Sequence, residues 1–392
     1  MAEPRRLDVV LLGATGFTGG LTAEHLARHA PPGTRWALAG RSPGKLAAVR
    51  ERLAAIDPAC AGLELLRADS EDPESLRAVA ESARVVATTV GPYLRLGEPL
   101  VAACARAGTD YADLTGEPEF VDRMYVRHHA AAVASGARIV HACGFDSIPY
   151  DLGVLFTVRQ LPEDVPLVVR GFVRAGGRLS AGTFHTAVNA FGRLRQAGAA
   201  HLERRRIEPR PQGRRIASVK DPARYERSLG AWALPLPTID PQVVKRSAAT
   251  LERYGPDFSY GHYAAVERLP VALGAAGAAG ALFALAQLPP ARAWLAGRME
   301  AGNGPSRERR ERSWFNVRFI GEGGGRRVVT EVAGGDPGYD ETAKMLAESA
   351  LCLAHDELPP SAGQVTTAVA MGEALTARLR ARGITFELLE SG

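Results

Sequence analysis

The segment CGFDSIPYDLG, residues 143–153, gathers a thiol, two carboxylates, a hydroxyl and a phenol around two glycines and a proline. Cys143 would be a nucleophile if His141, two residues earlier and on the same side of a strand, served as its base. We favour a buried structural cysteine, because the sequence offers only His141 as a base. Asp146 and Ser147 precede a helix that begins near Pro149, so they either cap that helix or contact a bound ligand.

Two further loops combine a rigid backbone with polar side chains: TVGPYLRLGEP (89–99) and DLTGEPEF (113–120). All three loops follow strand-like runs, and the carboxyl ends of parallel strands meet at one edge of a sheet, where ligands bind. Tyr93, which follows Gly91 and Pro92, is our candidate proton donor. The alternative is that Gly91 and Pro92 shape a cofactor pocket and that Tyr93 only packs against the cofactor.

The first apolar run, LDVVLL (7–12), leads directly into the glycine-rich loop GATGFTGG. Glycines spaced as GxxGxxG allow a tight turn, a close approach of the backbone to a diphosphate and close packing of the following helix. A strand before the loop and a helix after it make this a dinucleotide-binding motif. The residues predicted to contact the cofactor here are Gly13, Thr15, Gly16, Phe17, Thr18 and Gly19.

The second strand ends without the acidic residue that binds the ribose of NAD. It continues instead as AGRSPGKL, which places Arg41, Ser42 and Lys45 where the 2′-phosphate of NADP would lie. The sequence therefore favours NADP(H) over NAD(H) as the cofactor.

Six short apolar runs alternate with helical stretches in the first part of the chain, at residues 7–12, 35–40, 63–68, 84–90, 109–114 and 137–142. This pattern predicts an α/β fold, with an N-terminal Rossmann domain (1–150) built on a doubly wound parallel sheet. Longer strands then predict a second, α+β substrate domain (151–362). Residues 363–392 are expected to form a helix and a strand that return to the first domain. GEGGGRR (321–327) is interpreted as a β-hairpin turn, because strand-like runs flank it.

The motifs GATGFTG, AGRS, VGPY, GEP, DLTGE and CGFDSIPYDLG occur in the order and spacing of a known family. The chain resembles the saccharopine-dehydrogenase-like oxidoreductases, and most closely the mycobacterial-type trans-acting enoyl reductase subgroup. The resemblance extends to RSWFNVRFIGEGGGRRVVTEVAGGDPGYDETAKMLAESALCLA (312–354) and GQVTTAVAMGEALTARL (363–379). It implies an NADPH-dependent reductase of a carbon–carbon double bond on a polyketide synthase product in glycolipid biosynthesis.

Reduction of an enoyl thioester needs a hydride at the β-carbon, a donor for the enolate oxygen and a proton for the α-carbon. From their positions we assign Tyr93, Asp146 and Ser147 as the catalytic candidates. Two alternatives stay open: a saccharopine-type dehydrogenase of an amino acid adduct, and a non-catalytic NADPH-binding scaffold associated with a membrane.

No charged residue lies between Arg268 and Arg292, in the run LPVALGAAGAAGALFALAQLPPA. The length suits a membrane span, although alanine and glycine dominate and a proline pair ends the run. The alternatives are a hairpin against a membrane, an acyl-chain groove, a homodimer face or a buried helix. Gly274, Gly277 and Gly280 recur at every third residue and would permit close helix contact.

The net charge of +5 is concentrated in the later part of the chain, and basic residues outnumber acidic ones between Arg193 and Arg227. This stretch is either a solvated face or a patch for a carrier-bound thioester, a phosphopantetheine arm or an acidic membrane surface. Few aromatic residues interleave with it, so we do not expect a nucleic acid partner.

Four scattered cysteines without a CxxC pair indicate a reducing compartment. The N-terminus lacks the features of a signal peptide. We therefore expect a cytoplasmic protein, with a peripheral position on the inner face of the plasma membrane as a further option. His128 and His129 lack additional spaced ligands, and no metal site is predicted.

Overall fold

The computed structural model describes residues 5–176, 192–288, 290–291, 294 and 304–392. The described chain forms two compact units, each with its own sheet. The first unit holds residues 5–145, 304 and 339–379, and the second, which starts at Asp146, holds the other described residues.

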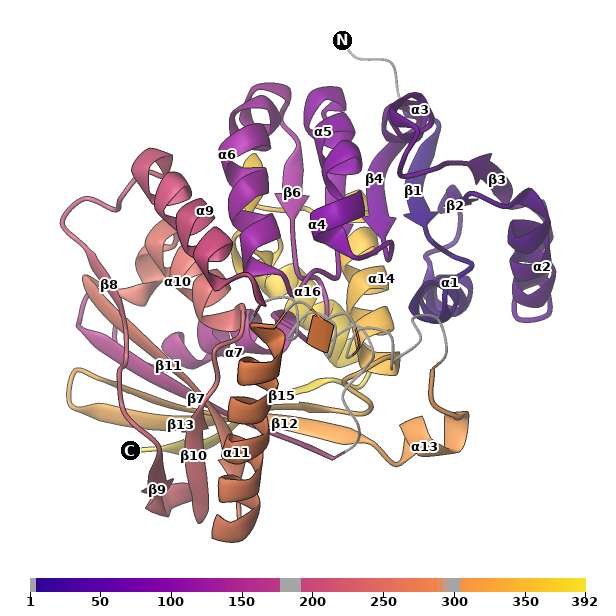
Figure 1. The fold of residues 1–392 in the computed structure, drawn as a ribbon. Coiled ribbons are helices and arrows are strands. Elements are labelled where there is room, and N and C mark those ends of the chain that lie inside the picture. Colours follow the sequence, from indigo (N-terminus) through magenta and orange to yellow (C-terminus); the bar gives the residue numbers. More distant parts are fainter. Residues whose placement is uncertain (1–4, 177–191, 289, 292–293, 295–303) are drawn as a thin grey trace. The chain divides into compact units, whose positions relative to one another are not determined.

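The sheet of the first unit is entirely parallel, with the strand order β14-β6-β5-β4-β1-β2-β3. Figure 1 labels five of these strands: β6, β4, β1, β2 and β3. The order reverses between β1 and β4, which is the point where doubly wound sheets bind their ligands. The predicted Rossmann sheet is thus confirmed, and all six expected strands are present. The strands are β1 (Leu7–Leu12), β2 (Trp36–Gly40), β3 (Glu64–Arg67), β4 (Ala83–Thr88), β5 (Asp110–Asp113), β6 (Arg138–Val140) and a seventh, β14 (Gly363–Val365).

Helices cover both faces of this sheet. On one face α3, α5 and α6 pack side by side, and on the other α1 packs against α14. Proline occupies the first turn of α2, α3, α5 and α6, where a missing N–H costs no hydrogen bond. The helices are α1 (Phe17–His29), α2 (Pro43–Ala54), α3 (Pro73–Ser82), α4 (Tyr93–Leu96), α5 (Glu98–Ala107), α6 (Pro118–Ser135), α14 (Asp340–His355), α15 (Thr367–Ala370) and α16 (Gly372–Ala381).

The second unit is built on a mixed sheet with the order β15-β13-β12-β7-β11-β10-β9, while β8 pairs with β11. Only the β7–β11 and β8–β11 pairs are parallel. Gly324 and Gly325, both with positive φ, join β12 and β13 in a hairpin, which confirms the interpretation of GEGGGRR. The strands are β7 (Leu167–Gly176), β8 (Arg215–Ser218), β9 (Arg224–Glu226), β10 (Ala231–Pro235), β11 (Asp257–Val266), β12 (Trp314–Gly323), β13 (Arg326–Gly334) and β15 (Thr385–Ser391).

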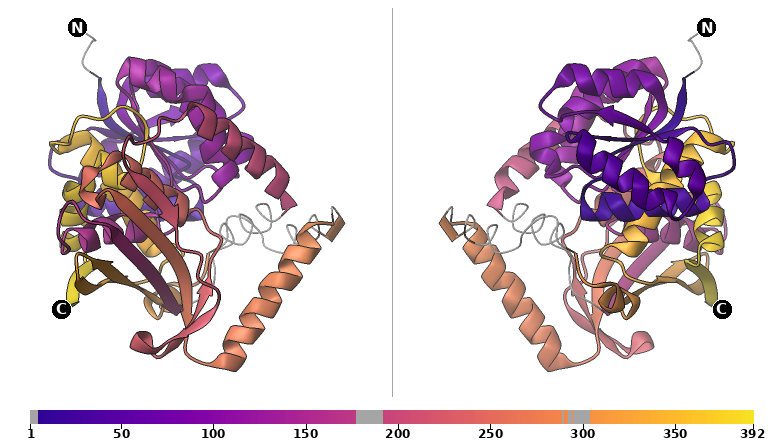
Figure 2. Two further views of the ribbon diagram at one scale, coloured as in Figure 1. Left: turned by 90° about the vertical axis from the view of Figure 1, so that its left-hand side faces the viewer. Right: turned by 90° about the vertical axis from the view of Figure 1, so that its right-hand side faces the viewer.

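Helix α7 lies on β7, β12 and β13 of this second sheet, and α10 packs beside it against β11. Both helices hold buried carboxyl groups, Asp151 on α7 and Asp240 on α10. Helix α11 leaves its own sheet at one end and extends away from it (Figure 2). The helices are α7 (Ile148–Val158), α9 (Leu194–Ile207), α10 (Asp240–Thr250), α11 (Leu269–Ala286) and α13 (Arg307–Glu311).

The division of the chain differs from the expected domain limits in two places. Helix α14 was expected in the substrate domain, but it packs on α1 and the parallel sheet of the first unit. The C-terminal segment was expected to return whole to the first domain. Its strand β14 and most of α16 belong there, but β15 pairs with β13 in the second sheet, so the expectation is wrong for this strand. The sequence does not reveal which sheet edge a short strand joins, since pairing depends on distant residues.

Candidate functional site

The glycine-rich loop from Gly13 to Gly19 follows β1, at the point where the strand order reverses. Its backbone is not covered by side chains at the glycines, and we call this segment the glycine cradle. Gly13 has φ +94°, and a Cβ at Gly19 would lie 2.1 Å from the carbonyl oxygen of Gly13. Thr89, just after β4, donates a hydrogen bond from Oγ1 to the same oxygen at 3.2 Å. The loops after β1 and β4 are therefore in direct contact, and no side chain fits between them.

The helix that follows this loop is suited to bind an anion. Helix α1 begins at Phe17, and Gly16 at its N-cap supplies no side-chain hydrogen bond. The first N–H groups of the helix therefore have no side-chain cap and face outward with the positive end of the helix dipole. Thr15 and Gly16 are exposed at the tip of the loop, whereas Phe17 packs edge-on against Tyr339 with ring centroids 5.0 Å apart. This cradle fits a dinucleotide diphosphate.

The residues expected at the 2′-phosphate follow β2, as predicted. Arg41 and Lys45 are exposed, and the segment from Arg41 to Lys45 contains no acidic residue. Ser42 has a structural role, because its Oγ accepts the N–H of Lys45 at 3.5 Å and caps helix α2. The two cations thus remain to bind a phosphate, which fits NADP(H).

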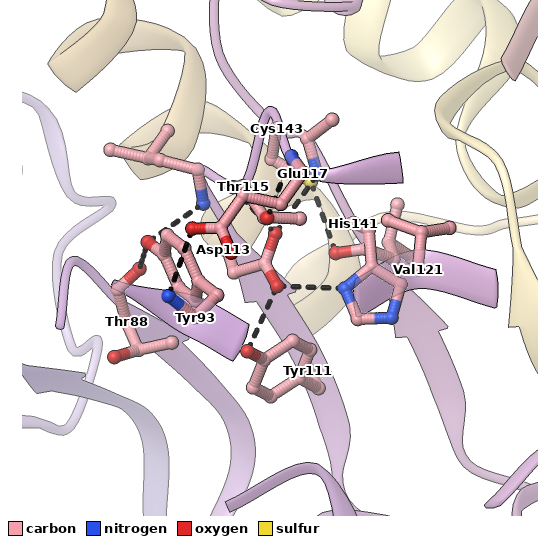
Figure 3. Close-up of polar contacts among 12 residues, drawn as sticks. Thr88, Tyr93, Tyr111, Asp113, Thr115, Glu117, Val121, His141 and Cys143 are labelled. Carbon is pink, nitrogen blue, oxygen red and sulfur yellow. Dashed lines mark hydrogen bonds and ion pairs between the residues drawn. The ribbon is translucent and has the colours of Figure 1, made fainter. Parts of the chain in front are cut away.

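The position of Tyr93 does not suit its predicted role as a proton donor. The residue is buried, and its hydroxyl donates to the carbonyl oxygen of Thr88 at 3.2 Å and accepts the N–H of Leu114 at 3.1 Å (Figure 3). Burial raises the pKa of this phenol well above its usual value. Tyr93 therefore links the ends of β4 and β5, and its hydroxyl is not placed to donate a proton to a substrate.

A buried carboxylate, Asp113, organises the loops after β5 and β6. Its Oδ2 accepts hydrogen bonds from the Tyr111 hydroxyl at 2.9 Å and from His141 Nδ1 at 2.7 Å (Figure 3). Its Oδ1 accepts the N–H groups of Thr115 and Ala142, both at 3.0 Å. Both oxygens are thus fully used, so Asp113 holds the loops together and has no free lone pair directed at a ligand.

Cys143 lies within this buried network. Its side chain is fully buried, and burial followed by the charge of Asp113 raises the pKa of its thiol. His141 already donates to Asp113 and cannot activate the thiol through Nδ1. These contacts support a structural cysteine, because a nucleophilic cysteine needs a lowered pKa.

Asp146 and Ser147 begin the second unit. Ser147 is the N-cap residue of α7, but its side chain makes no capping hydrogen bond, and its buried Oγ has no partner among the described residues. Side-chain capping, one of the two expected roles, is therefore wrong. Asp146 is partly buried, and burial raises its pKa from 3.8 to about 6. Both residues retain polar atoms that a ligand could use.

Sequence reasoning missed a second group of polar residues in this unit. Asp240, at the start of α10, is buried, and its Oδ2 lies 3.6 Å from Nε2 of His262 on β11. The Tyr260 hydroxyl lies 3.1 Å from Nδ1 of the same histidine, and the Tyr150 ring meets the imidazole edge-on. The alternation of Phe258, Tyr260 and His262 along β11 was a usable signal for a shared inward face. Asp240 gave no such signal, because Asp followed by Pro is also typical of an ordinary helix start.

Comparisons with known proteins agree with this geometry. Residues 9–140 match the family of the saccharopine dehydrogenase NADP binding domain. A Mycobacterium tuberculosis protein, named provisionally as a trans-acting enoyl reductase, is 40% identical, with 98% of each chain aligned. The trans-acting enoyl reductase of Mycobacterium ulcerans is 38% identical, with 97% of each chain aligned.

Among solved structures, saccharopine dehydrogenase of Saccharomyces cerevisiae aligns with 98% of this chain and 100% of its own, with a TM-score of 0.56. At 12% identity this likeness concerns the fold alone. The NADP-binding family, the glycine cradle and the exposed Arg41 and Lys45 together confirm NADP(H) as the cofactor.

Proposed function

Since this chain belongs to the saccharopine-dehydrogenase-like oxidoreductases, in the family of the trans-acting enoyl reductases, we propose that it reduces the double bond of an enoyl chain with NADPH. The proposal rests on the 40% identity to the Mycobacterium tuberculosis protein, which extends over 98% of each chain. The glycine-rich loop that would bind NADP is also intact. The match covers the second unit as well as the cofactor unit, so it supports a shared substrate class.

The bound cofactor supplies a hydride, which is added to the β-carbon of the substrate. The chain must then hold the enoyl carbonyl and provide a proton for the α-carbon. Asp146 and Ser147 follow the loop that leaves the carboxyl end of β6. The unpartnered hydroxyl of Ser147 is a donor suited to the carbonyl oxygen, and Asp146 offers a carboxyl group that titrates near neutral pH.

The cofactor assignment is tested by titration with NADPH and NADH. Substitution Arg41→Ala is expected to weaken NADPH binding about tenfold, equivalent to about 1.4 kcal/mol, and to leave NADH binding unchanged. Arg77→Ala, in an exposed arginine of α3, is the matched control and should change neither affinity. An equal loss for both cofactors in Arg41→Ala would contradict a role at the 2′-phosphate.

The reaction is tested by following NADPH oxidation with an enoyl thioester and, separately, with a zwitterionic imine adduct of an amino acid. Turnover of the thioester is the expected result. Turnover of the amino acid adduct alone would favour the saccharopine-type dehydrogenase instead. Binding of NADPH without turnover of either substrate would favour a scaffold.

We further propose that the substrate is a lipid or polyketide intermediate of glycolipid biosynthesis, and that the protein works at the inner face of the membrane. The support is α11, the one helix in the described part of the chain that by length and composition could cross a membrane; only 12% of it is buried. Its exposed large side chains are Leu269, Val271, Leu273, Phe283 and Leu285.

The connectivity argues against a complete span. Strands β11 and β12, which precede and follow α11, both pair with β7 in one sheet. After a span the chain would have to recross the bilayer with Arg292, Arg298 and Glu300 and without a second apolar run. Helix α11 is therefore proposed to insert into one leaflet only.

Lipid is favoured over a second protein copy because the exposed large side chains lie on two opposite sides of the helix. At about 100° per residue, Leu269, Leu273 and Phe283 fall on one side, and Val271 and Leu285 fall on the other. A dimer contact covers one side only. The basic segment around α9 would then serve an acidic lipid surface, or the acyl carrier that delivers the substrate.

Co-sedimentation with vesicles of anionic phospholipid tests this location. The wild-type protein should bind, and the paired change Leu273→Asp and Phe283→Asp should release it. Val133→Asp on the exposed face of α6 is the control and should still bind. A wild-type dimer that ignores vesicles and dissociates in the α11 variant would contradict the proposal.

A further inference from the structure

In the second unit, the last turn of α9 and the middle of α10 place several cations close together. We propose that Lys245, Ser218 and Arg205 bind the phosphate group of a ligand. All three residues belong to the second unit. The inference goes beyond the proposed reaction and does not depend on it, because phosphate binding is measured without turnover.

Lys245 on α10 is a partly buried cation without an acidic partner among the described residues. Its Nζ donates a hydrogen bond to Oγ of Ser218, the last residue of β8, at 2.8 Å. Burial, followed by the charges of Arg205 and Arg204, lowers the pKa of Lys245. Both neighbouring charges are positive, so the folded chain supplies no negative charge to this ammonium group.

The carboxylate that joins the two helices is already used. Glu208, which follows α9, pairs through one oxygen with Arg204 and accepts a hydrogen bond from Nε of Arg246 through the other, at 3.0 Å. Arg205 is exposed and, like Lys245, makes no ion pair among the described residues. The two helices therefore carry an excess of positive charge around Lys245.

Lys344 on α14 shows what a partly buried lysine elsewhere in this chain has as its partner. Its Nζ lies 2.7 Å from Oε2 of Glu341, one turn earlier on the same helix. An ammonium group that is removed from water without such an acid loses hydration and gains repulsion from its neighbours. Lys245 lacks the carboxylate that Lys344 has, and a bound anion would supply the missing negative charge.

A phosphate group fits the donors at this place. A phosphate ester presents three strong acceptor oxygens, and the site offers three donor groups: an ammonium, a hydroxyl and a guanidinium. Because Oγ of Ser218 accepts the hydrogen bond from Lys245, its own hydrogen is available to donate to a ligand. Ser218 and Arg205 are both exposed, so a ligand reaches them from solvent.

The main experiment is calorimetric titration of inorganic phosphate at low ionic strength into protein saturated with NADP+, which keeps phosphate out of the glycine cradle. Lys245→Gln should weaken phosphate binding about tenfold, because it removes the partly buried charge. Lys220→Gln, in an exposed lysine two residues after Ser218, is the matched control and should bind within about twofold of wild type. Equal small losses in both variants would show an ordinary solvated basic face and overturn the proposal, as would absence of binding to wild type.

A second variant leaves the charges in place. Ser218→Ala removes an exposed hydroxyl at the end of a strand and should weaken phosphate binding about threefold. Unchanged NADPH affinity shows that each variant is folded. If a folded Ser218→Ala bound phosphate as well as wild type does, the assignment of Ser218 would be wrong.

Two further probes distinguish the sources of the phosphate group. Phosphopantetheine is a soluble phosphate ester, and vesicles of phosphatidylcholine with added phosphatidic acid present the same group on a lipid. A tenfold loss in Lys245→Gln for phosphopantetheine alone supports a soluble ligand, and a loss for the vesicles alone supports a lipid headgroup. If Lys245→Gln and Lys220→Gln bind both probes equally, the phosphate site is wrong, while the proposed enoyl reduction is unaffected.

Discussion

Each unit of this protein contains a cluster of a buried aspartate, histidine and tyrosine, and the hydrogen bonds in the two clusters differ. In the first unit Asp113 is central, and Tyr111, His141 and two backbone N–H groups all bind it. In the second unit His262 is central, and Oδ1 of Asp240 has no hydrogen-bond partner among the described residues. The same residue types therefore saturate the carboxylate with hydrogen bonds in one cluster and leave one carboxyl oxygen unpaired in the other. In the first cluster the atom without a partner in the described part of the chain is instead Nε2 of His141.

The largest expected effect is a difference in the free energy of unfolding between a variant of the first cluster and a variant of the second. Asp113→Asn removes a charged acceptor from four hydrogen bonds and should lower the free energy of unfolding by about 3 kcal/mol. Asp240→Asn keeps the size of a side chain whose Oδ1 has no hydrogen-bond partner among the described residues, and should change this free energy by less than about 1 kcal/mol. Urea unfolding measures both values. If both variants lost the same free energy of unfolding, the two clusters would not differ in how strongly their carboxyl groups stabilise the fold.

The second prediction concerns pH and Asp146. Because burial raises its pKa to about 6, the folded state holds this proton more tightly than the unfolded chain does. The ionised group therefore costs stability as the pH rises from about 4 to about 6, and the full cost is present above that range. Asp146→Asn should gain stability relative to wild type across this window, measured by urea unfolding at about pH 4 and about pH 7. If the difference in free energy of unfolding between the two proteins were the same at both pH values, this result would contradict the buried environment of Asp146.

A smaller effect is expected for Tyr93→Phe. The change removes the hydrogen bonds to Thr88 and Leu114 and leaves a buried N–H unpaired, which should cost about 1–2 kcal/mol of stability. Turnover should stay within about twofold of wild type, because the hydroxyl is not presented to a substrate. A 100-fold loss of kcat in a stable variant would restore Tyr93 as the proton donor.

The smallest effect is expected at Cys143. Since its thiol is buried with a raised pKa, iodoacetamide should modify it slowly in the folded protein and rapidly in urea. Cys143→Ala should reduce enoyl thioesters at a rate within about twofold of wild type. Rapid labelling of Cys143 in the folded protein, together with loss of activity, would show that the Asp113 cluster is accessible to ligands.

The sequence was most informative where chemistry depends on consecutive residues. The glycine spacing, the cations after the second strand and the hairpin around Gly324 and Gly325 are local patterns, and the structure has them as predicted. Tyr93 was misjudged because its two partners, Thr88 and Leu114, belong to different strands and their following loops. The C-terminal strand was misplaced for a related reason, because β15 pairs with a strand that is remote in the chain.

By itself, then, the sequence determined the parallel sheet, its glycine cradle and the preference for NADP(H), because turn geometry, strand patterning and phosphate binding are encoded over short stretches. Only the tertiary structure decided which polar residues of CGFDSIPYDLG remain available. It buried Cys143 beside the hydrogen-bond network of Asp113, left the Ser147 hydroxyl without a partner among the described residues, and brought Asp240 to His262 from separate elements. The physical reason is that burial and hydrogen-bond satisfaction are properties of neighbours in space, and these neighbours lie on helices and strands far apart in the chain.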